Sequence, residues 1–212
     1  MTQEAIQDII RRQREFFYTG ATLNIDFRIE ALKKLQASIQ AHQEQIDAAL
    51  KADLGKSSFE SYMCESGLVL SEITYLLKHI RSLSREKTVH TPLAQFHSRS
   101  FQKPSPYGVS LIMSPWNYPF LLTLDPLADA LAAGNTAVLK PSAYSPATGA
   151  VLCEIIRECF PEHHVAVVMG GRAENACLLQ EHFDYIFFTG SQSVGKEVMR
   201  KASEHLTPVT LE

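Results

Sequence analysis

Three stretches in the first third of the chain place apolar residues on one side of a helix. Within residues 6–17, apolar side chains recur every three or four positions, and the same spacing returns over residues 25–50 and 59–80. Gly20 and Gly55 follow the first two stretches, where glycine commonly ends a helix. The pattern predicts three helices, the second of them long, and assigns their apolar stripes to packing rather than to chemistry.

Polar residues mark the helix starts and a connection after the third helix. Thr2 can cap the first helix, and Ser57 with Glu60 has the spacing of a capping box. From residue 81 to 106 the apolar period disappears and prolines interrupt the chain. We expect a connecting arm there, with residues 99–103 as a short extended strand.

From residue 107 onward, short apolar runs alternate with helical periods. Five runs of four or five residues, each bounded by turn residues, are typical of strands: 109–113, 136–139, 165–168, 185–188 and 208–211. Strands that are apolar throughout belong to parallel sheets, which are buried on both faces.

The gaps between these runs carry helical spacing. The helices expected there cover residues 121–133, 146–159, a short stretch that ends at 179, and 191–205. Alternation of strand and helix predicts an α/β protein whose parallel sheet is covered by helices on both faces.

Ligands of such sheets bind beyond the carboxyl ends of the strands. The loops after Met113, Leu139, Val168 and Phe188 are therefore the places where we expect chemistry.

The loop after Phe188 contains two glycines, Gly190 and Gly195, at a junction of strand and helix. Glycines there let the amides of a helix N-terminus approach a phosphate, which the helix dipole also favours. The spacing is not G-x-G-x-x-G, and Lys196 is followed by Glu197, which excludes a P-loop. A tight turn with close packing explains the two glycines equally well.

Two other loop residues can act on a ligand. Lys140, at the end of a strand, can reach an anionic or hydroxyl-bearing group, although a solvated lysine is the simpler interpretation of this residue alone. Asn117 stands between aromatic residues just before a helix. Its amide can donate a hydrogen bond to a developing oxyanion, or it can simply cap the helix.

Composition narrows the class of protein. The 212 residues carry a formal net charge of −3 without a long block of like charge, which argues against binding to nucleic acid or anionic lipid. The acidic start is unlike a signal peptide, and no apolar run approaches the ~20 residues of a membrane helix. Four scattered cysteines lack C-x-x-C spacing, and the adjacent His163 and His164 suit a solvated turn. We expect a cytoplasmic protein without a metal site.

Four motifs in series carry a resemblance to a known family. They are S-P-W-N-Y-P-F at residues 114–120, N-T-A-V-L-K-P-S at 135–142, F-T-G-S-Q-S-V-G at 188–195 and T-P-V-T-L-E at 207–212. Together they resemble the aldehyde dehydrogenase superfamily, and the W-N-Y-P version is most similar to the class 3 branch, which acts on fatty and aromatic aldehydes. The resemblance extends from the first helix to the last residue.

The resemblance implies a Rossmann-like NAD(P)-binding domain over residues 1–212. Residues 1–86 would be its helical N-terminal part, residues 87–106 the connecting arm and residues 107–212 the parallel α/β part. The family implies a homodimer for the parent protein, with a small aldehyde as substrate and NAD or NADP as cofactor.

The resemblance also implies roles for individual residues. Asn117 would stabilise the oxyanion of the thiohemiacetal, and Glu212 would act as general base on the water that releases the acid. Lys140 would meet the ribose hydroxyls of the adenosine. The residues expected at the cofactor are Trp116, Lys140, Ser142, Gly190, Ser191, Val194 and Gly195.

Two departures from the family pattern matter. Ala143 stands where the family usually has a ribose-binding Glu, so a 2′-phosphate would meet no negative charge there. The family's nucleophilic cysteine comes later than Glu212, and the cysteines present are interpreted as buried small hydrophobic residues, namely Cys64, Cys153, Cys159 and Cys177. The final Leu-Glu fits the family directly, although such a pair can also be a cloning scar.

These observations leave three interpretations open. The chain is the cofactor half of an enzyme that oxidises an aldehyde to a carboxylic acid, and is inactive alone. Alternatively, it is a non-catalytic dinucleotide-binding module, or part of an acyl-CoA or acyl-phosphate reductase relative, against which Glu212 argues. Without a catalytic domain, the region of Trp116, Tyr118 and Phe120 would be exposed, and we expect such a chain to self-associate.

Overall fold

A parallel sheet forms the centre of the protein. The computed structural model describes residues 1–212. The five strands of the sheet are β3 (Val109–Met113), β4 (Thr136–Lys140), β5 (Val165–Val167), β6 (Tyr185–Phe188) and β7 (Val209–Leu211). Their order across the sheet is β5-β4-β3-β6-β7, with every neighbouring pair parallel. The predicted α/β fold is confirmed, and the direction of winding reverses between β3 and β6.

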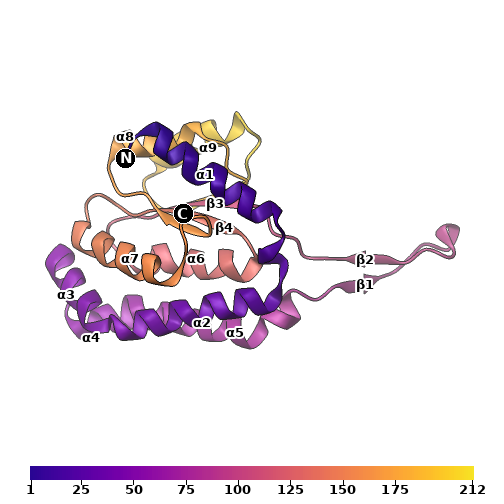
Figure 1. The fold of residues 1–212 in the computed structure, drawn as a ribbon, viewed down its shortest axis with the longest axis horizontal. Coiled ribbons are helices and arrows are strands. Elements are labelled where there is room, and N and C mark those ends of the chain that lie inside the picture. Colours follow the sequence, from indigo (N-terminus) through magenta and orange to yellow (C-terminus); the bar gives the residue numbers. More distant parts are fainter.

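Helices cover both faces of this sheet (Figure 1). Those that connect the strands are α6 (Leu121–Ala133), α7 (Pro146–Cys159), α8 (Arg172–Gln180) and α9 (Gln192–Ser203). Successive side chains of a strand point to opposite faces. Leu111 accordingly packs in the core with α1, α8 and α9, whereas Ile112 packs in the core with α6 and α7.

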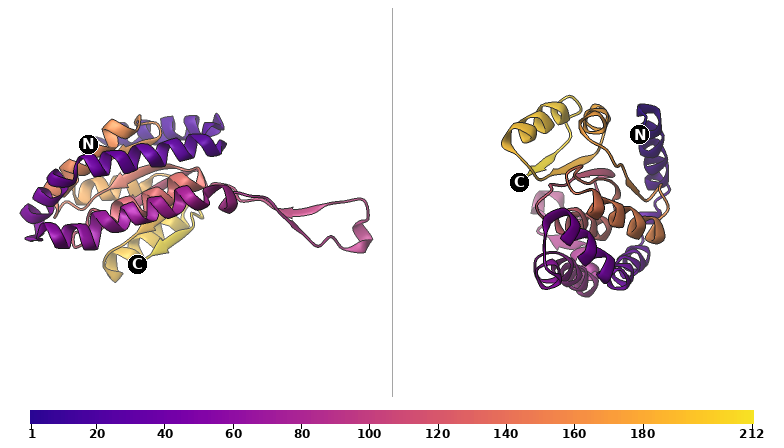
Figure 2. Two further views of the ribbon diagram at one scale, coloured as in Figure 1. Left: turned by 90° about the horizontal axis from the view of Figure 1, so that it is seen from below. Right: turned by 90° about the vertical axis from the view of Figure 1, so that its left-hand side faces the viewer.

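The helices before the sheet divide between its two sides. They are α1 (Gln3–Tyr18), α2 (Ile25–Ala41), α3 (Gln43–Leu54), α4 (Ser58–Ser61) and α5 (Gly67–Leu83), with a short 3₁₀ turn at Ala21–Leu23. Helix α1 buries Ile6, Ile9 and Ile10 on the side of α8 and α9. Helices α2, α3 and α5 instead form an outer layer over α6 and α7 (Figures 1 and 2).

The prediction of one helix over residues 25–50 is wrong. Helix α2 ends at Ala41 and α3 begins at Gln43, with His42 between them. The His42 Nδ1 atom lies 2.8 Å from the carbonyl oxygen of Ser38, so the ring satisfies an acceptor at the end of α2. Both helices pack on α7, and their apolar spacing therefore continues through the break.

The third predicted helix contains a π-helical turn. Ser57 caps its start, since its Oγ accepts the N–H of Glu60 at 3.2 Å. The turn, Tyr62–Ser66, joins α4 to α5. Gly67 permits this path, because a Cβ at that position would lie 2.5 Å from the carbonyl oxygen of Tyr62. Glu65 belongs to this turn and is fully buried.

The arm after α5 is a β-hairpin that extends away from the body (Figure 2). Strands β1 (Lys87–Val89) and β2 (Ser100–Gln102) pair antiparallel, and the 3₁₀ turn Leu93–Gln95 lies between them. The sequence indicated only the second strand, because β1 consists of three exposed residues without an alternating pattern. No helix of the protein has both the length and the apolarity that crossing a membrane requires.

Two side chains are buried where the sequence suggested exposure. His164 lies with its ring centroid 5.1 Å from that of Phe27 and 5.4 Å from that of Phe160, so it does not belong to a solvated turn. Phe120, the residue directly before α6, is fully buried in the core, whereas Trp116 and Tyr118 of the same loop are exposed.

Candidate functional site

A cavity of about 360 Å³ opens at the carboxyl edge of the sheet, beside the reversal point between β3 and β6. Lys140, the last residue of β4, lines it and is only 3% exposed. Its Nζ donates to the carbonyl oxygen of Pro141 at 2.7 Å. Burial lowers the pKa of the Lys140 ammonium, and the carboxylate of Glu174 acts in the opposite direction. Ser142 and Val194 line the same cavity, so three of the expected cofactor residues lie together.

The segment after β5 completes this cavity with Gly170, Gly171, Arg172 and Asn175. No individual residue of this segment was predicted, although the double glycine before a helix marked the loop. The Oδ1 atom of Asn175 is buried without a hydrogen-bond partner. Gly170 has a φ of +139°, and a Cβ there would lie 2.3 Å from the carboxylate of Glu174. Glycine is therefore required at position 170 to let the chain pass this side chain.

The N-terminus of α9 borders the cavity on the other side of β3. Ser191 is its N-cap, and its side chain accepts the N–H of Val194 at 3.5 Å. A Cβ on Gly190 would approach the ring of Phe188 to 2.6 Å, so packing alone explains this glycine. A Cβ on Gly195 would make only ordinary contacts of 3.7 Å or more. The close packing of this chain therefore does not explain Gly195.

Glu212 lies in an adjoining hollow of about 280 Å³, which shares Phe188 with the first cavity and also contains Gly190, Ser191 and Gly195. The backbone of Glu212 continues the pairing of β7 with β6: its N–H donates to Phe188 at 2.9 Å, and its carbonyl accepts from Gly190 at 3.0 Å. Its Oε2 accepts the hydroxyl of Thr189 at 3.3 Å. The main chain thus directs Glu212 to the same edge of the sheet.

Trp116 and Asn117 stand on the loop between β3 and α6 and line neither hollow. Both side chains are exposed. The carbonyl oxygen of Trp116 accepts the hydroxyl of Ser145 at 3.1 Å, and that of Asn117 accepts Nζ of Lys56 at 2.9 Å. The structure therefore separates these two predicted residues from the other seven, although all nine lie at the same edge of the sheet.

The cysteines do not line either hollow. Cys153 and Cys159 are buried, and burial raises the pKa of both thiols. Cys64 and Cys177 are only half-buried, so the expectation that all four are buried is wrong for these two.

Two carboxyls on α6 are perturbed. Burial, together with the carboxylates of Glu72 and Glu212, raises the pKa of Asp125 to about 6. Burial, Glu72 and Asp125 likewise raise the pKa of Asp129 to about 6. Asp125 and Asp129 of α6 and Glu72 of α5 therefore form an acidic group, and Asp125 is its member that interacts with Glu212.

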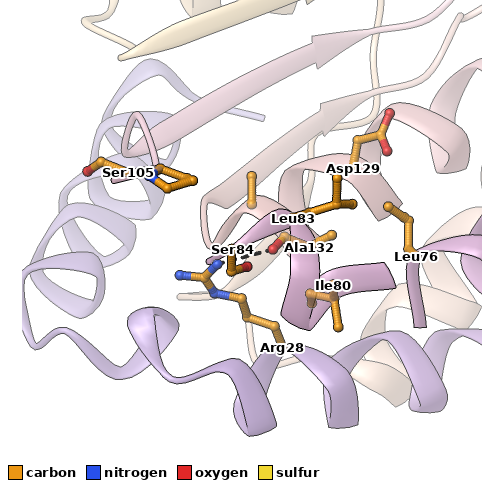
Figure 3. A pocket seen from close by; sticks show the side chains of 10 residues that line it. Arg28, Leu76, Ile80, Leu83, Ser84, Ser105, Asp129 and Ala132 are labelled. Atoms are coloured by element: carbon orange, nitrogen blue, oxygen red, sulfur yellow. Dashed lines mark hydrogen bonds between the residues drawn. The ribbon is translucent and has the colours of Figure 1, made fainter. Parts of the chain in front are cut away.

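A separate pocket, beyond the other end of α6, has a structural role. Figure 3 shows Arg28 of α2 directed at Ala132, whose carbonyl oxygen accepts from the guanidinium at 3.2 Å. A second bond of 2.6 Å joins Arg28 to the carbonyl oxygen of Thr22. Gly134 has a φ of +94°, and a Cβ there would lie 2.6 Å from the guanidinium. Arg28 thus satisfies carbonyl groups near a helix end, and no predicted site residue lines this pocket.

One group of side chains away from the sheet edge has the composition of a metal site. Ligand atoms of His42, Glu154 and Glu158 lie within 4.8 Å of one another. Contacts within the protein occupy both ring nitrogens of His42, because Nε2 lies 3.5 Å from Oε1 of Glu158 and Nδ1 lies 2.8 Å from the carbonyl oxygen of Ser38.

The fold and the edge cavity define a doubly wound α/β protein with a hollow at the reversal point of its sheet, which is where ligands of such folds bind. The model of the aldehyde dehydrogenase family matches residues 1–212. The chain belongs to the aldehyde dehydrogenase family.

Individual relatives agree with this assignment. Aldehyde dehydrogenase family 3 member B1 of Homo sapiens is 43% identical over 209 residues, which are 99% of this chain and 45% of that protein. A structure described as the substrate-bound state of Staphylococcus aureus AldH is 43% identical, with a TM-score of 0.96 over 98% of this chain and 45% of that one. The NAD⁺ complex of an aldehyde dehydrogenase from Bacillus cereus is 25% identical, with a TM-score of 0.88 over 99% of this chain and 43% of that one. The chain thus spans less than half the length of these relatives, and the expected resemblance to class 3 enzymes is confirmed.

Proposed function

We propose that this chain binds a nicotinamide dinucleotide along the carboxyl edge of its sheet and supplies the cofactor-binding part of an enzyme that oxidises aldehydes. The observation that carries the proposal is the edge cavity, in which Lys140 of β4 and the N-terminal turn of α9 converge beside the reversal point. The Bacillus cereus relative, solved as an NAD⁺ complex, shares the fold and supports the same interpretation.

The residues present fit such a ligand. The N-terminal turn of a helix offers backbone N–H groups and a favourable dipole for a pyrophosphate, and Ser191 leads into that turn on α9. Nζ of Lys140 can exchange its bond to Pro141 for ribose hydroxyls. The buried Oδ1 of Asn175, which lacks a partner, is an acceptor in the same cavity. Ser142, Val194 and Gly195 would complete the contacts, and Trp116 would flank the ligand.

A bound dinucleotide would supply the hydride acceptor, and two residues of this chain would serve the aldehyde. The side-chain amide of Asn117 would donate to the oxygen on which negative charge develops. The carboxylate of Glu212 would take a proton from the water that attacks the acyl group. Both steps, stabilisation of the oxyanion and attack of water on the acyl group, require that a thiolate has first attacked the aldehyde. Burial and a raised pKa disfavour a thiolate at Cys153 and Cys159, and neither Cys64 nor Cys177 lines the hollow that contains Glu212, so we propose that this chain alone has no turnover.

We further propose that NADP is accepted at least as well as NAD. Ala143 lines the cavity and presents no charge to a ribose 2′-phosphate, while Lys140 and Arg172 are cations in the same lining. The acid nearby, Glu174, is already engaged by the N-terminal ammonium at 3.1 Å and by the N–H of Gly171 at 2.8 Å. The balance of charge in the lining is therefore positive.

Calorimetric titration with NAD⁺ and NADP⁺ tests the binding proposal. Wild type should bind both saturably, and Lys140→Met should weaken both at least tenfold, about 1.4 kcal/mol. Lys33→Met, which alters an exposed lysine on α2, should leave binding unchanged. Absence of saturable binding, or equal effects of the two lysine variants, would overturn the proposal.

The same titration tests cofactor choice. Ala143→Glu should lower NADP⁺ affinity at least fivefold relative to NAD⁺, because it places a carboxylate against the 2′-phosphate. A wild-type preference for NAD⁺ above about tenfold, or about 1.4 kcal/mol, would contradict the argument from charge.

A further inference from the structure

A buried ion pair lies directly beneath the loop that carries Trp116 and Asn117. Lys56 Nζ and Glu65 Oε1 are 2.5 Å apart, and their side chains are 8% and 0% exposed. Burying two charges costs about as much free energy as their attraction returns, and the best-attested use of such a pair is to specify one arrangement of the chain. The contacts of the two side chains show which arrangement is specified.

Glu65 holds the start of α6. Its Oε2 accepts the N–H groups of Phe120 at 2.8 Å and of Leu121 at 3.1 Å. These are donors at a helix N-terminus, which otherwise lack a partner, and the negative charge also suits the helix dipole. The π-helical turn at Tyr62–Ser66 delivers Glu65 to this position, and such turns occur frequently at functional sites.

Lys56 holds the residue that would serve as oxyanion donor. Beyond Glu65, its Nζ donates to the carbonyl oxygen of Asn117 at 2.9 Å, and it lies 4.1 Å from the centroid of the Tyr118 ring. Asn117 makes no hydrogen bond other than this one from Lys56 to its carbonyl oxygen. Because Gly55 turns the chain with a φ of +72° after α3, the lysine stem runs back into the protein rather than into solvent.

We infer that Lys56 and Glu65 are positioning residues, which together set the place of Asn117 relative to the cofactor edge. The inference rests on the proposed function for the meaning of that position. Neither residue lines the cavity or touches a ligand site. Glu65 fixes the start of α6 through its bonds to Phe120 and Leu121. Lys56 binds both Glu65 and the carbonyl oxygen of Asn117. The backbone of Asn117 is therefore restrained, although its side-chain amide is exposed.

The double variant K56M/E65Q tests this inference in the intact chain. The glutamine introduced by E65Q retains an oxygen that can accept the N–H groups of Phe120 and Leu121, while the bond to Asn117 is lost and no buried charge is left unpaired. K33M/E30Q, which removes an exposed pair on α2, is the matched control. Urea unfolding first establishes that each variant is folded.

The decisive measurement is ¹⁵N relaxation of the loop amides at residues 116–118. Wild type and control should give order parameters of about 0.85, and K56M/E65Q should fall below about 0.6 at Asn117. An unchanged order parameter in the folded double variant would overturn the inference. If that variant does not fold, wild type still decides: a value below about 0.6 at Asn117 would refute the restraint, and a rigid Asn117 with a slowly exchanging Lys56 ammonium would support it.

Titration with the dinucleotide separates this inference from the proposed function. If wild type has a rigid loop that loosens in K56M/E65Q but binds no dinucleotide, the proposed function fails and the restraint stands. If dinucleotide binds while the loop is equally ordered in both proteins, the positioning role fails alone.

Discussion

The buried imidazole of His164 predicts a specific loss of stability in acid. The ring is surrounded by Phe16, Phe27 and Phe160 at centroid distances of 5.1 to 5.7 Å and makes no side-chain hydrogen bond. Burial, together with the positive charges of His163 and Lys34, lowers the pKa of His164 to about 4 from its ordinary 6.5. Protonation in the folded state would place a cation among aromatic rings without an anionic partner.

The sign of the change in stability with pH follows from proton binding by the folded and the unfolded chain. Well above pH 6.5 the ring is neutral in the folded and the unfolded chain, so it contributes no pH dependence there. Between pH 6.5 and 4 the unfolded chain binds a proton that the folded chain does not, so the free energy of unfolding falls as the pH is lowered. A difference of about 2.5 pKa units corresponds to about 3 kcal/mol, most of which is lost between pH 7 and 4.5.

Asp125 and Asp129 act in the opposite direction. Their pKa values of about 6 exceed the ordinary 3.8, so the folded chain binds protons first, and stability rises as the pH falls through this range. The pH dependence of the free energy of unfolding of wild type therefore sums these opposite contributions. The contribution of His164 is obtained by comparing wild type with a variant that lacks this histidine.

Urea unfolding of wild type, His164→Phe and His90→Gln at pH 7 and 4.5 provides this difference. His164→Phe should become more stable relative to wild type by about 2 kcal/mol on moving to pH 4.5. His90→Gln, which changes an exposed histidine of the arm, should follow wild type. Parallel behaviour of His164→Phe and wild type, within about 0.5 kcal/mol, would refute the assignment of acid sensitivity to His164.

Three further outcomes are expected. Gly134→Ala should destabilise the chain by about 2 kcal/mol or more in urea unfolding, because the new Cβ meets the guanidinium of Arg28 and φ is positive; a loss below about 0.5 kcal/mol would contradict this. The chain should self-associate in dilute buffer through the surface with Trp116 and Tyr118, and a monodisperse monomer in light scattering would refute that expectation. Aldehyde-dependent reduction of NAD(P)⁺ should equal the no-enzyme rate; a higher rate that is lost on replacing one cysteine would identify a nucleophile among the four present.

The sequence predicted the parallel sheet well because each central strand is apolar on both faces. β3, β6, α6 and α7 begin and end at the predicted residues, where turn residues stop the apolar period. The break at His42 was missed because helices on both sides of it pack against α7, so the apolar spacing is uninterrupted. His164 was misjudged because its burial depends on aromatic residues from distant parts of the chain.

The candidate site was predictable only where topology determines it. Loops at the carboxyl ends of parallel strands must share one edge, which is why Lys140 and Val194 meet in one cavity. Lys56 and Glu65 act through contacts 61 and 55 residues away in sequence, and no local spacing indicates them. Asn175 likewise becomes a candidate only through a buried oxygen atom without a partner.

The outer helical layer provides carboxylates to the helices on its own side of the sheet. Glu65 accepts N–H groups at the start of α6. Asp53 of α3 does the same for α7, accepting the N–H of Ala147 at 3.1 Å and that of Thr148 at 2.7 Å. Helix α9, on the opposite side, has only the hydroxyl of Ser191 as its cap. Unlike those at the N-termini of α6 and α7, the N–H groups at the N-terminus of α9 thus donate no hydrogen bond to a carboxylate of the protein. Its N–H groups and helix dipole therefore remain available to an anionic ligand.

Ser191→Asp therefore distinguishes a ligand-binding helix end from an ordinary one. Asp is as good an N-cap as Ser, and its charge suits the helix dipole, so the free energy of unfolding should stay constant or rise by up to about 1 kcal/mol. The same carboxylate would occupy the position of a pyrophosphate and repel it, so dinucleotide affinity should fall more than tenfold. Ser57→Asp, at the equivalent cap of α4 and away from the cavity, is the control and should leave affinity unchanged. Equal dinucleotide affinity for Ser191→Asp and wild type, measured by calorimetry, would mean that the pyrophosphate does not bind at α9.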